Sequence, residues 1–195
     1  LFTRLLDTEL YGQYLLFISY VSLVSSLLFW WHRLSVYRYY YKFKDDYGSY
    51  IKTSYYLYII LITLIIIFCF IVFVLPISQT IKSIIYVIGV GAIVKSNFEL
   101  NQNLFNISRS DNMFGINAII RPLVFLIFGF ILISFFKINQ FALIYAFILS
   151  FFLITIYSNY IIWKNSPQGI FRSDIVGKFA FYGFPMIGLF IFDYI

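Results

Sequence analysis

The sequence predicts an all-α protein that crosses a membrane about six times, and two observations lead to this fold class. The first is composition: 62% of the 195 residues are hydrophobic and 11% are charged, whereas a soluble domain is about 45–50% apolar and about 25% charged. A domain of this size exposes a large share of its surface, so one water-facing core cannot bury so many apolar side chains. The second is the spacing of charged residues, which divides the chain into long uncharged runs.

Three of these runs are long enough to cross a membrane without interruption. They lie between Glu9 and His32, between Lys52 and the proline at 76, and between Lys137 and Lys164. Each exceeds the roughly 18–20 apolar residues that cross a ~30 Å hydrocarbon core. The sequence therefore predicts spans at residues 10–31, 53–76 and 138–163.

Three further runs are interrupted by charge. Residues 116–136 contain Arg121, which precedes Pro122 as in a first helical turn and has a side chain long enough to reach headgroups. Residues 179–195 are apolar apart from an aspartate near the end of the run. Residues 77–98 contain two lysines, which leave only 83–94 uncharged.

The charges of the loops favour six spans over five. If all six runs cross, the first, third and fifth loops hold ten basic residues and the opposite side holds three. If residues 77–98 do not cross, one side of the membrane holds six basic residues and the other holds seven. Short cytoplasmic or matrix loops carry an excess of Lys and Arg, so we expect a single membrane domain, 1–195, with six spans and both ends outside.

Two groups of basic residues are candidate functional sites. Four lie directly beyond the first span with tyrosines between them, and a cluster of this kind attracts anionic lipid at about 1 kcal/mol per charge. The predicted headgroup site, for phospholipid such as cardiolipin, consists of Arg33, Arg38, Lys42 and Lys44. Lys95 and Arg121 are the bases nearest the membrane interior. Each either pairs with Glu99 or a lipid phosphate, or belongs to a proton path.

The sequence predicts no catalytic, cofactor-binding or metal-binding residue. His32 is the one histidine, and we expect it at the membrane interface. Cys69 is the one cysteine, so neither an intramolecular disulfide nor a Cys-based metal site is expected. There is no phosphate-binding loop, dinucleotide fingerprint or nucleophile elbow. The acidic residues all fall in expected loops or near span ends, and nucleic acid is not an expected partner.

The composition resembles that of proteins encoded in AT-rich mitochondrial genomes of unicellular eukaryotes such as ciliates. Phe occurs 25 times and Tyr 18 times, Ile fills the spans, Ala is scarce, and the first residue is not Met. Residues 86–94 are also similar to the third helix of the sixth membrane subunit of NADH dehydrogenase, although Lys95 and Asn97 follow where that family stays apolar. Proteins kept in such genomes are mostly respiratory-chain membrane subunits.

This resemblance implies a multi-pass protein of the mitochondrial inner membrane that takes part in respiratory electron transport. We expect a non-catalytic subunit of cytochrome c oxidase or NADH dehydrogenase, which packs on catalytic subunits and organises lipid. Two alternatives stay open: a proton-pathway subunit of NADH dehydrogenase, and a stand-alone small transporter or membrane enzyme. The absence of a buried carboxylate or of paired polar groups in the middle of any expected span disfavours the second.

Overall fold

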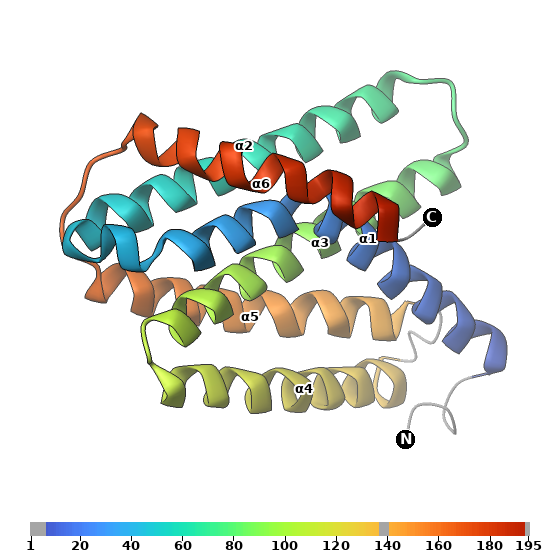
Figure 1. Ribbon diagram of the computed structural model, residues 1–195. Coiled ribbons are helices and arrows are strands. Elements are labelled where there is room, and N and C mark those ends of the chain that lie inside the picture. Colours follow the sequence, from blue (N-terminus) through green and yellow to red (C-terminus); the bar gives the residue numbers. More distant parts are fainter. Residues whose placement is uncertain (1–6, 137–140, 194–195) are drawn as a thin grey trace.

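The computed structural model describes residues 7–136 and 141–193, and within them the chain is all-α. Figure 1 shows the helices. Their bounds are α1 Thr8–Tyr39, η2 Tyr41–Asp46, α2 Tyr47–Val74, α3 Gln79–Ile107, α4 Asp111–Ser134, α5 Ala142–Asn165 and α6 Ser173–Asp193. Five segments among the described residues (α1, η2 with α2, α3, α4 and α5) are long and apolar enough to cross a membrane. The predicted fold class, an all-α multi-pass membrane protein, is confirmed.

The helices run back and forth between two ends of the bundle (Figure 1). The α1–α2, α3–α4 and α5–α6 connections lie together at one end, which we call the inner end. The beginning of α1, the α2–α3 connection and the end of α6 lie at the opposite, outer end. This alternation is the arrangement that six successive crossings would require. The sixth predicted span falls on α6, and parts of the last two predicted spans, 138–140 and 194–195, lie outside the described residues.

The helices extend further at the inner end than the predicted spans. The polar segment after Lys95, expected to be a loop, is helical as far as Ile107, because no Gly or Pro interrupts it. The chain then turns at Arg109, which has a positive φ of 56°. Glu99, expected in a loop, therefore lies inside α3, which corrects that expectation.

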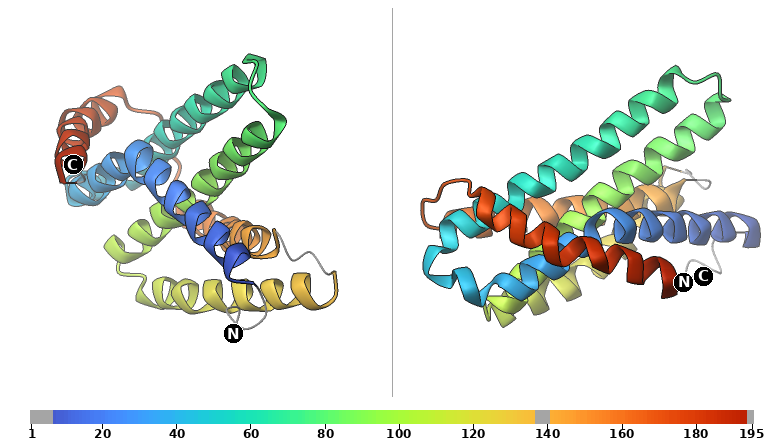
Figure 2. Two further views of the ribbon diagram at one scale, coloured as in Figure 1. Left: turned by 90° about the vertical axis from the view of Figure 1, so that its right-hand side faces the viewer. Right: turned by 45° about the horizontal axis from the view of Figure 1, so that its top comes forward.

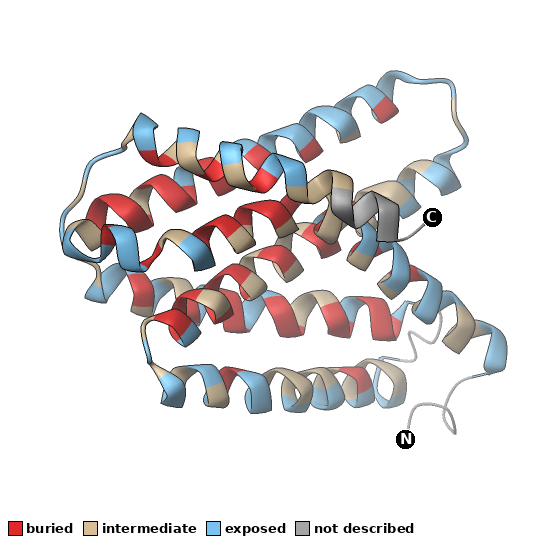
Figure 3. Ribbon diagram, viewed as in Figure 1, coloured by how far each residue is buried: buried red, intermediate tan, exposed pale blue. Residues whose placement is uncertain are grey.

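The core lies mainly towards the inner end (Figure 3). There α6 packs across α1 and α2, with the ring of Phe179 5.9–6.0 Å from the rings of His32, Tyr39 and Tyr50. A second cluster joins α1, α3 and α5, and is formed by Phe17, Val21, Phe98, Ile144, Phe147, Phe151 and Ile154. By contrast, only two residues of α4 are buried.

The outer parts of α2 and α3 lead away from the rest of the bundle, as both views of Figure 2 show. We call residues 66–89 the outer hairpin. Lys82 donates a hydrogen bond of 2.8 Å to the carbonyl of Phe73 and so satisfies one of the free carbonyls at the end of α2. Gly89 allows close approach, since a Cβ there would lie 3.3 Å from Ile65 and 3.4 Å from Cys69. The hairpin is therefore closed at its base and at its tip.

The α5–α6 connection lies directly on the first turns of α2. The backbones of Gly48 and Gly169 are in contact. Lys52 donates to the carbonyl of Gly169 at 3.1 Å, and the amide of Ile170 donates to the Ser49 hydroxyl at 3.2 Å. These contacts fix the position from which α6 starts.

The arrangement of the connections makes a prediction about topology. In a Cys69→Ser background, single cysteines at Tyr47 and Gln168 should label from the same side of the membrane with an impermeant maleimide, because both positions lie at the inner end. A cysteine at Gln79, at the outer end, should label from the opposite side. Opposite labelling of Tyr47 and Gln168 would contradict six alternating crossings.

An ion cluster at the start of α6 predicts a response to acid. Arg172 pairs with Asp46 at 2.9 Å and with Asp174 at 2.8 Å. The hydrogen bond from Arg172 holds the pKa of Asp174 below its ordinary value. A carboxyl group whose pKa is lower in the folded state stabilises that state above its unfolded pKa, and this contribution disappears as the pH falls through the folded pKa.

We therefore expect the α5–α6 connection to be released below about pH 4, with no change between about pH 6 and 8. Limited proteolysis of the detergent-purified chain with an acid-active protease would measure the release. Asp174→Asn should weaken the dependence on pH. Release of the connection between pH 6 and 8 would contradict this account.

Candidate functional site: a charged pocket between α1, α3 and α4

Charged side chains from three helices, α1, α3 and α4, meet in the inner half of the bundle. Arg33 of α1 forms a direct hydrogen-bonded ion pair with Glu99 of α3. Lys95 Nζ, one helical turn before Glu99, lies 3.6 Å from the same carboxylate. The side chains of Arg33, Lys95 and Glu99 are 13%, 18% and 27% exposed, so the cluster is largely enclosed.

Helical spacing explains why these groups meet. Lys95 and Glu99 are four residues apart and so share one face of α3. Ser22, Ser25 and Arg33 lie along the facing stripe of α1. Lys95 donates to the Ser22 hydroxyl at 2.9 Å, and the Ser25 hydroxyl lies 3.4 Å from Glu99. The polar residues of α1 thus match those of α3 along their contact.

Arg121 of α4 lies on the other side of the same pocket. Its guanidinium is 4.7 Å from the ring centroid of Phe151 and 5.9 Å from that of Phe98, distances at which a cation is attracted to an aromatic face. Within the described residues, no carboxylate lies at ion-pairing distance from it. The pocket has a volume of about 490 Å³ and is also lined by Gln102 and Ala118. It contains three cationic side chains and one carboxylate.

The structure separates the four residues predicted to bind headgroups. Arg33 forms an ion pair with Glu99 inside the pocket. Arg38 lies over the ring of Tyr182, 4.2 Å from its centroid. Lys42 and Lys44 are exposed on η2. The headgroup contact of these four residues stays a prediction, whereas Lys95 and Arg121, singled out for their depth, line one pocket together with Arg33.

His32, which is predicted to lie at the membrane interface, is buried against other helices of the protein. Its ring lies 6.1 Å from Trp31 and 6.0 Å from Phe179 of α6. Neither ring nitrogen has a hydrogen-bond partner among the described residues. Sequence reasoning missed this burial, since it depends on α6 docking against α1, where Gly183 lies close to Trp31 and Ser35.

A second polar group joins α2, α3 and α5. The Tyr55 hydroxyl donates to the amide oxygen of Asn101 at 2.6 Å and lies 3.1 Å from that of Asn159. Asn101 donates to Asn159 at 2.7 Å. Asn117 of α4 donates to the Ser158 hydroxyl at 2.9 Å. Because these amides and hydroxyls pair with one another inside an apolar bundle, they fix how the four helices meet.

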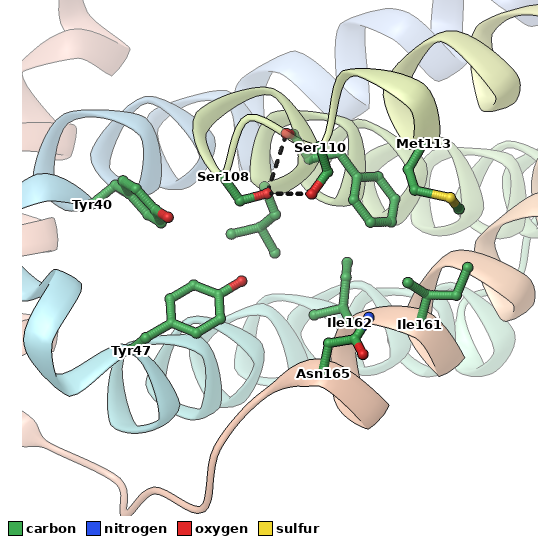
Figure 4. A pocket seen from close by; sticks show the side chains of 10 residues that line it. Tyr40, Tyr47, Ser108, Ser110, Met113, Ile161, Ile162 and Asn165 are labelled. Atoms are coloured by element: carbon green, nitrogen blue, oxygen red, sulfur yellow. Dashed lines mark hydrogen bonds between the residues drawn. The ribbon is translucent and has the colours of Figure 1, made fainter.

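A smaller cavity of about 240 Å³ lies closer to the inner end (Figure 4). Tyr40 and Tyr47 form one side of it and Met113 and Ile161 the other, with the hydroxyls of Ser108 and Ser110 3.2 Å apart. Its lining is mixed, with no Lys, Arg, Asp, Glu or His side chain. In the part of the chain that the structure describes, no group of three or more His, Cys, Asp or Glu side chains could hold a metal ion.

The fold and this site define a class of protein, a multi-pass α-helical membrane protein with a basic pocket between its helices. Comparison with known proteins does not narrow this class further. No family model matches the chain, and neither a curated protein nor a solved structure is significantly similar to it.

Proposed function

We propose that the chain is a non-catalytic membrane subunit of a mitochondrial respiratory complex, either cytochrome c oxidase or NADH dehydrogenase. Its role in this proposal is to pack against catalytic subunits in the inner membrane and to organise phospholipid between them. The composition supports the mitochondrial assignment, since Phe and Tyr are abundant (25 and 18 residues), Ile fills the spans and Ala is scarce, as in proteins of AT-rich mitochondrial genomes. The basic pocket supports the lipid role.

The observation that carries the proposal is the uncovered apolar surface of the outer hairpin. Phe68, Phe70 and Phe73 are 57%, 66% and 63% exposed. At 3.6 residues per turn, Phe68 points about 140–160° away from Phe70 and Phe73, so exposed aromatic side chains lie on more than one side of α2. A helix that is apolar on all sides belongs among lipids or other helices. The outer hairpin therefore suits insertion between the helices of other subunits.

One alternative has a specific observation in its favour. The ion pairs of Glu99 and the network of Asn101 lie on the same helix, α3, and supply titratable and hydrogen-bonding groups in neighbouring positions. Such groups inside a membrane domain are often part of a proton path. This favours a proton-pathway subunit of NADH dehydrogenase as the second candidate, ahead of a stand-alone transporter.

Blue-native electrophoresis of mitochondrial membranes in mild detergent tests the first candidate. We expect the chain to migrate with a respiratory complex and to co-purify with its catalytic subunits. Migration as a free protein would contradict the proposal and favour the stand-alone transporter.

The turnover rate of each assembled complex distinguishes the proton-pathway candidate from the non-catalytic subunit. We expect Glu99→Gln to change how much complex assembles while each assembled complex turns over normally. A fall in turnover of about tenfold or more in a fully assembled complex would instead place Glu99 in a proton path.

A further inference from the structure

The charged pocket lies at the boundary between the apolar and polar parts of the helices. Arg33 comes directly after the uncharged run 10–31 of α1 and His32, and Lys95 directly after the run 83–94 of α3. Arg121 comes directly before the run 122–136 of α4. Three neighbouring helices thus change from apolar to charged at the pocket. In a membrane protein such a change marks the approach to the headgroups, and long basic side chains reach them from just inside a span.

The pocket has more positive charge than the protein itself balances. Glu99 is shared between Arg33 and Lys95, which leaves Arg121 with aromatic neighbours and, among the described residues, no carboxylate at ion-pairing distance. Arginine and lysine side chains both bind phosphate oxygens through charge-assisted hydrogen bonds. The charge balance therefore favours an anion beside Arg121.

Further polar groups in the pocket lack partners. Gln102 is only 9% exposed and lines the pocket, yet neither its amide nitrogen nor its amide oxygen has a hydrogen-bond partner among the described residues. The Nε of Arg33 is also buried without a partner there. A buried polar group without a partner is costly, and an anion with several acceptor oxygens would satisfy the donors of both side chains.

The walls of the pocket indicate the source of that anion. Phe98, Phe151 and Ala118 line it alongside the cations, and so does Phe114, which is 41% exposed. In the apolar part of α4 that follows Arg121, Leu123 and Ile127 are 51% and 56% exposed. A cationic pocket next to an exposed apolar helix surface matches a molecule with a phosphate group and hydrocarbon chains.

We propose that this pocket binds the phosphate group of a phospholipid from the membrane leaflet on the side of the inner end. Arg121 and Lys95 hold the phosphate, Gln102 donates to it, and the acyl chains lie along the exposed face of α4. This assignment rests on the lipid-organising part of the proposed function and names the residues responsible. It does not depend on which complex the chain joins.

Binding to the purified full-length chain in neutral detergent tests the assignment. The probes are cardiolipin, phosphatidylglycerol and inorganic phosphate, each followed by the shift in thermal unfolding midpoint against concentration. We expect both lipids to stabilise the wild-type chain saturably, and Arg121→Gln to weaken their binding by about fivefold or more. Lys164→Gln is the matched control, because Lys164 is an exposed basic residue near the same end and outside the pocket.

A second variant keeps every charge. Ala118→Phe adds bulk to the pocket wall and should weaken lipid binding even though the basic residues remain, which also covers the case that Arg121→Gln fails to fold. Equal loss of binding in Lys164→Gln would show general charge attraction and overturn the proposal. Normal lipid binding by Ala118→Phe would also overturn it, as would saturable binding of inorganic phosphate without binding of lipid. Since the purified chain is used, these outcomes are independent of the electrophoretic test of complex membership.

Discussion

Gly169→Ala is expected to detach the α5–α6 connection from α2 and to destabilise the purified chain by about 1–3 kcal/mol, the usual cost of overpacking. A Cβ at this position would collide with the backbone of Gly48 and Ser49. Backbone atoms cannot rotate away as a side chain can, so the connection itself has to move. That movement would also break the hydrogen bonds of Lys52 and Ile170 that hold the connection on α2.

The measurement is the free energy of unfolding in mixed detergent micelles, followed by circular dichroism. Gly177→Ala is the matched control, because Gly177 lies inside α6 and an added Cβ there has nothing within 4 Å. An Ala in a helix interior is better than a Gly by about 0.5–1 kcal/mol, so the control should be neutral or stabilised. A Gly169→Ala chain as stable as the wild type would show that the close contact is not required.

The fold class follows from local features of the sequence, and for that reason it could be predicted. Uncharged runs and the charges that separate them determine which segments enter a membrane, whatever their neighbours are. The length of α3 could not be read in the same way. Residues beyond Lys95 are polar, which indicates a loop if polarity alone is considered, yet they contain nothing that breaks a helix.

The candidate site could be predicted only in part. Lys95 and Arg121 stand out because both lie close to apolar runs, but their meeting in one pocket depends on how α3, α4 and α5 pack. The i, i+4 spacing of Lys95 and Glu99 predicts their pairing only if α3 is a helix over both residues. The burial of His32 had no signal in the sequence, since α6 covers it from far along the chain.

The grouping of Arg33 with Arg38 shows why neighbours in sequence need not share a function. Their positions in the sequence predict that both lie in a loop beyond the first span. Because α1 continues to Tyr39, these two residues lie about 140° apart around a helix of 3.6 residues per turn. One therefore faces α3 and the other faces Tyr182 of α6.

Glu99→Gln is expected to destabilise the chain by roughly 2–3 kcal/mol, because it leaves three cationic side chains in one pocket without a carboxylate. Breaking a fully buried ion pair costs roughly 3–5 kcal/mol, and the lower figure allows for the partial exposure of this site. The amide still accepts hydrogen bonds, so the loss measures charge more than shape. Arg33→Gln should be destabilising as well, since Glu99 then keeps only Lys95.

The double variant Arg33→Gln/Glu99→Gln separates an ion pair from two independent effects. Unfolding free energies of the wild type, both single variants and the double variant form a cycle whose interaction energy isolates the pair. We expect the double variant to lose clearly less than the sum of the single losses, because removing both partners restores the net charge that the pocket has in the wild type. The exposed pair of Arg172 and Asp46 serves as the control and should show a smaller interaction energy, since solvent screens it. Additive losses at Arg33 and Glu99 would mean that their contact does not organise the pocket, and that the cations are held in place by helix packing alone.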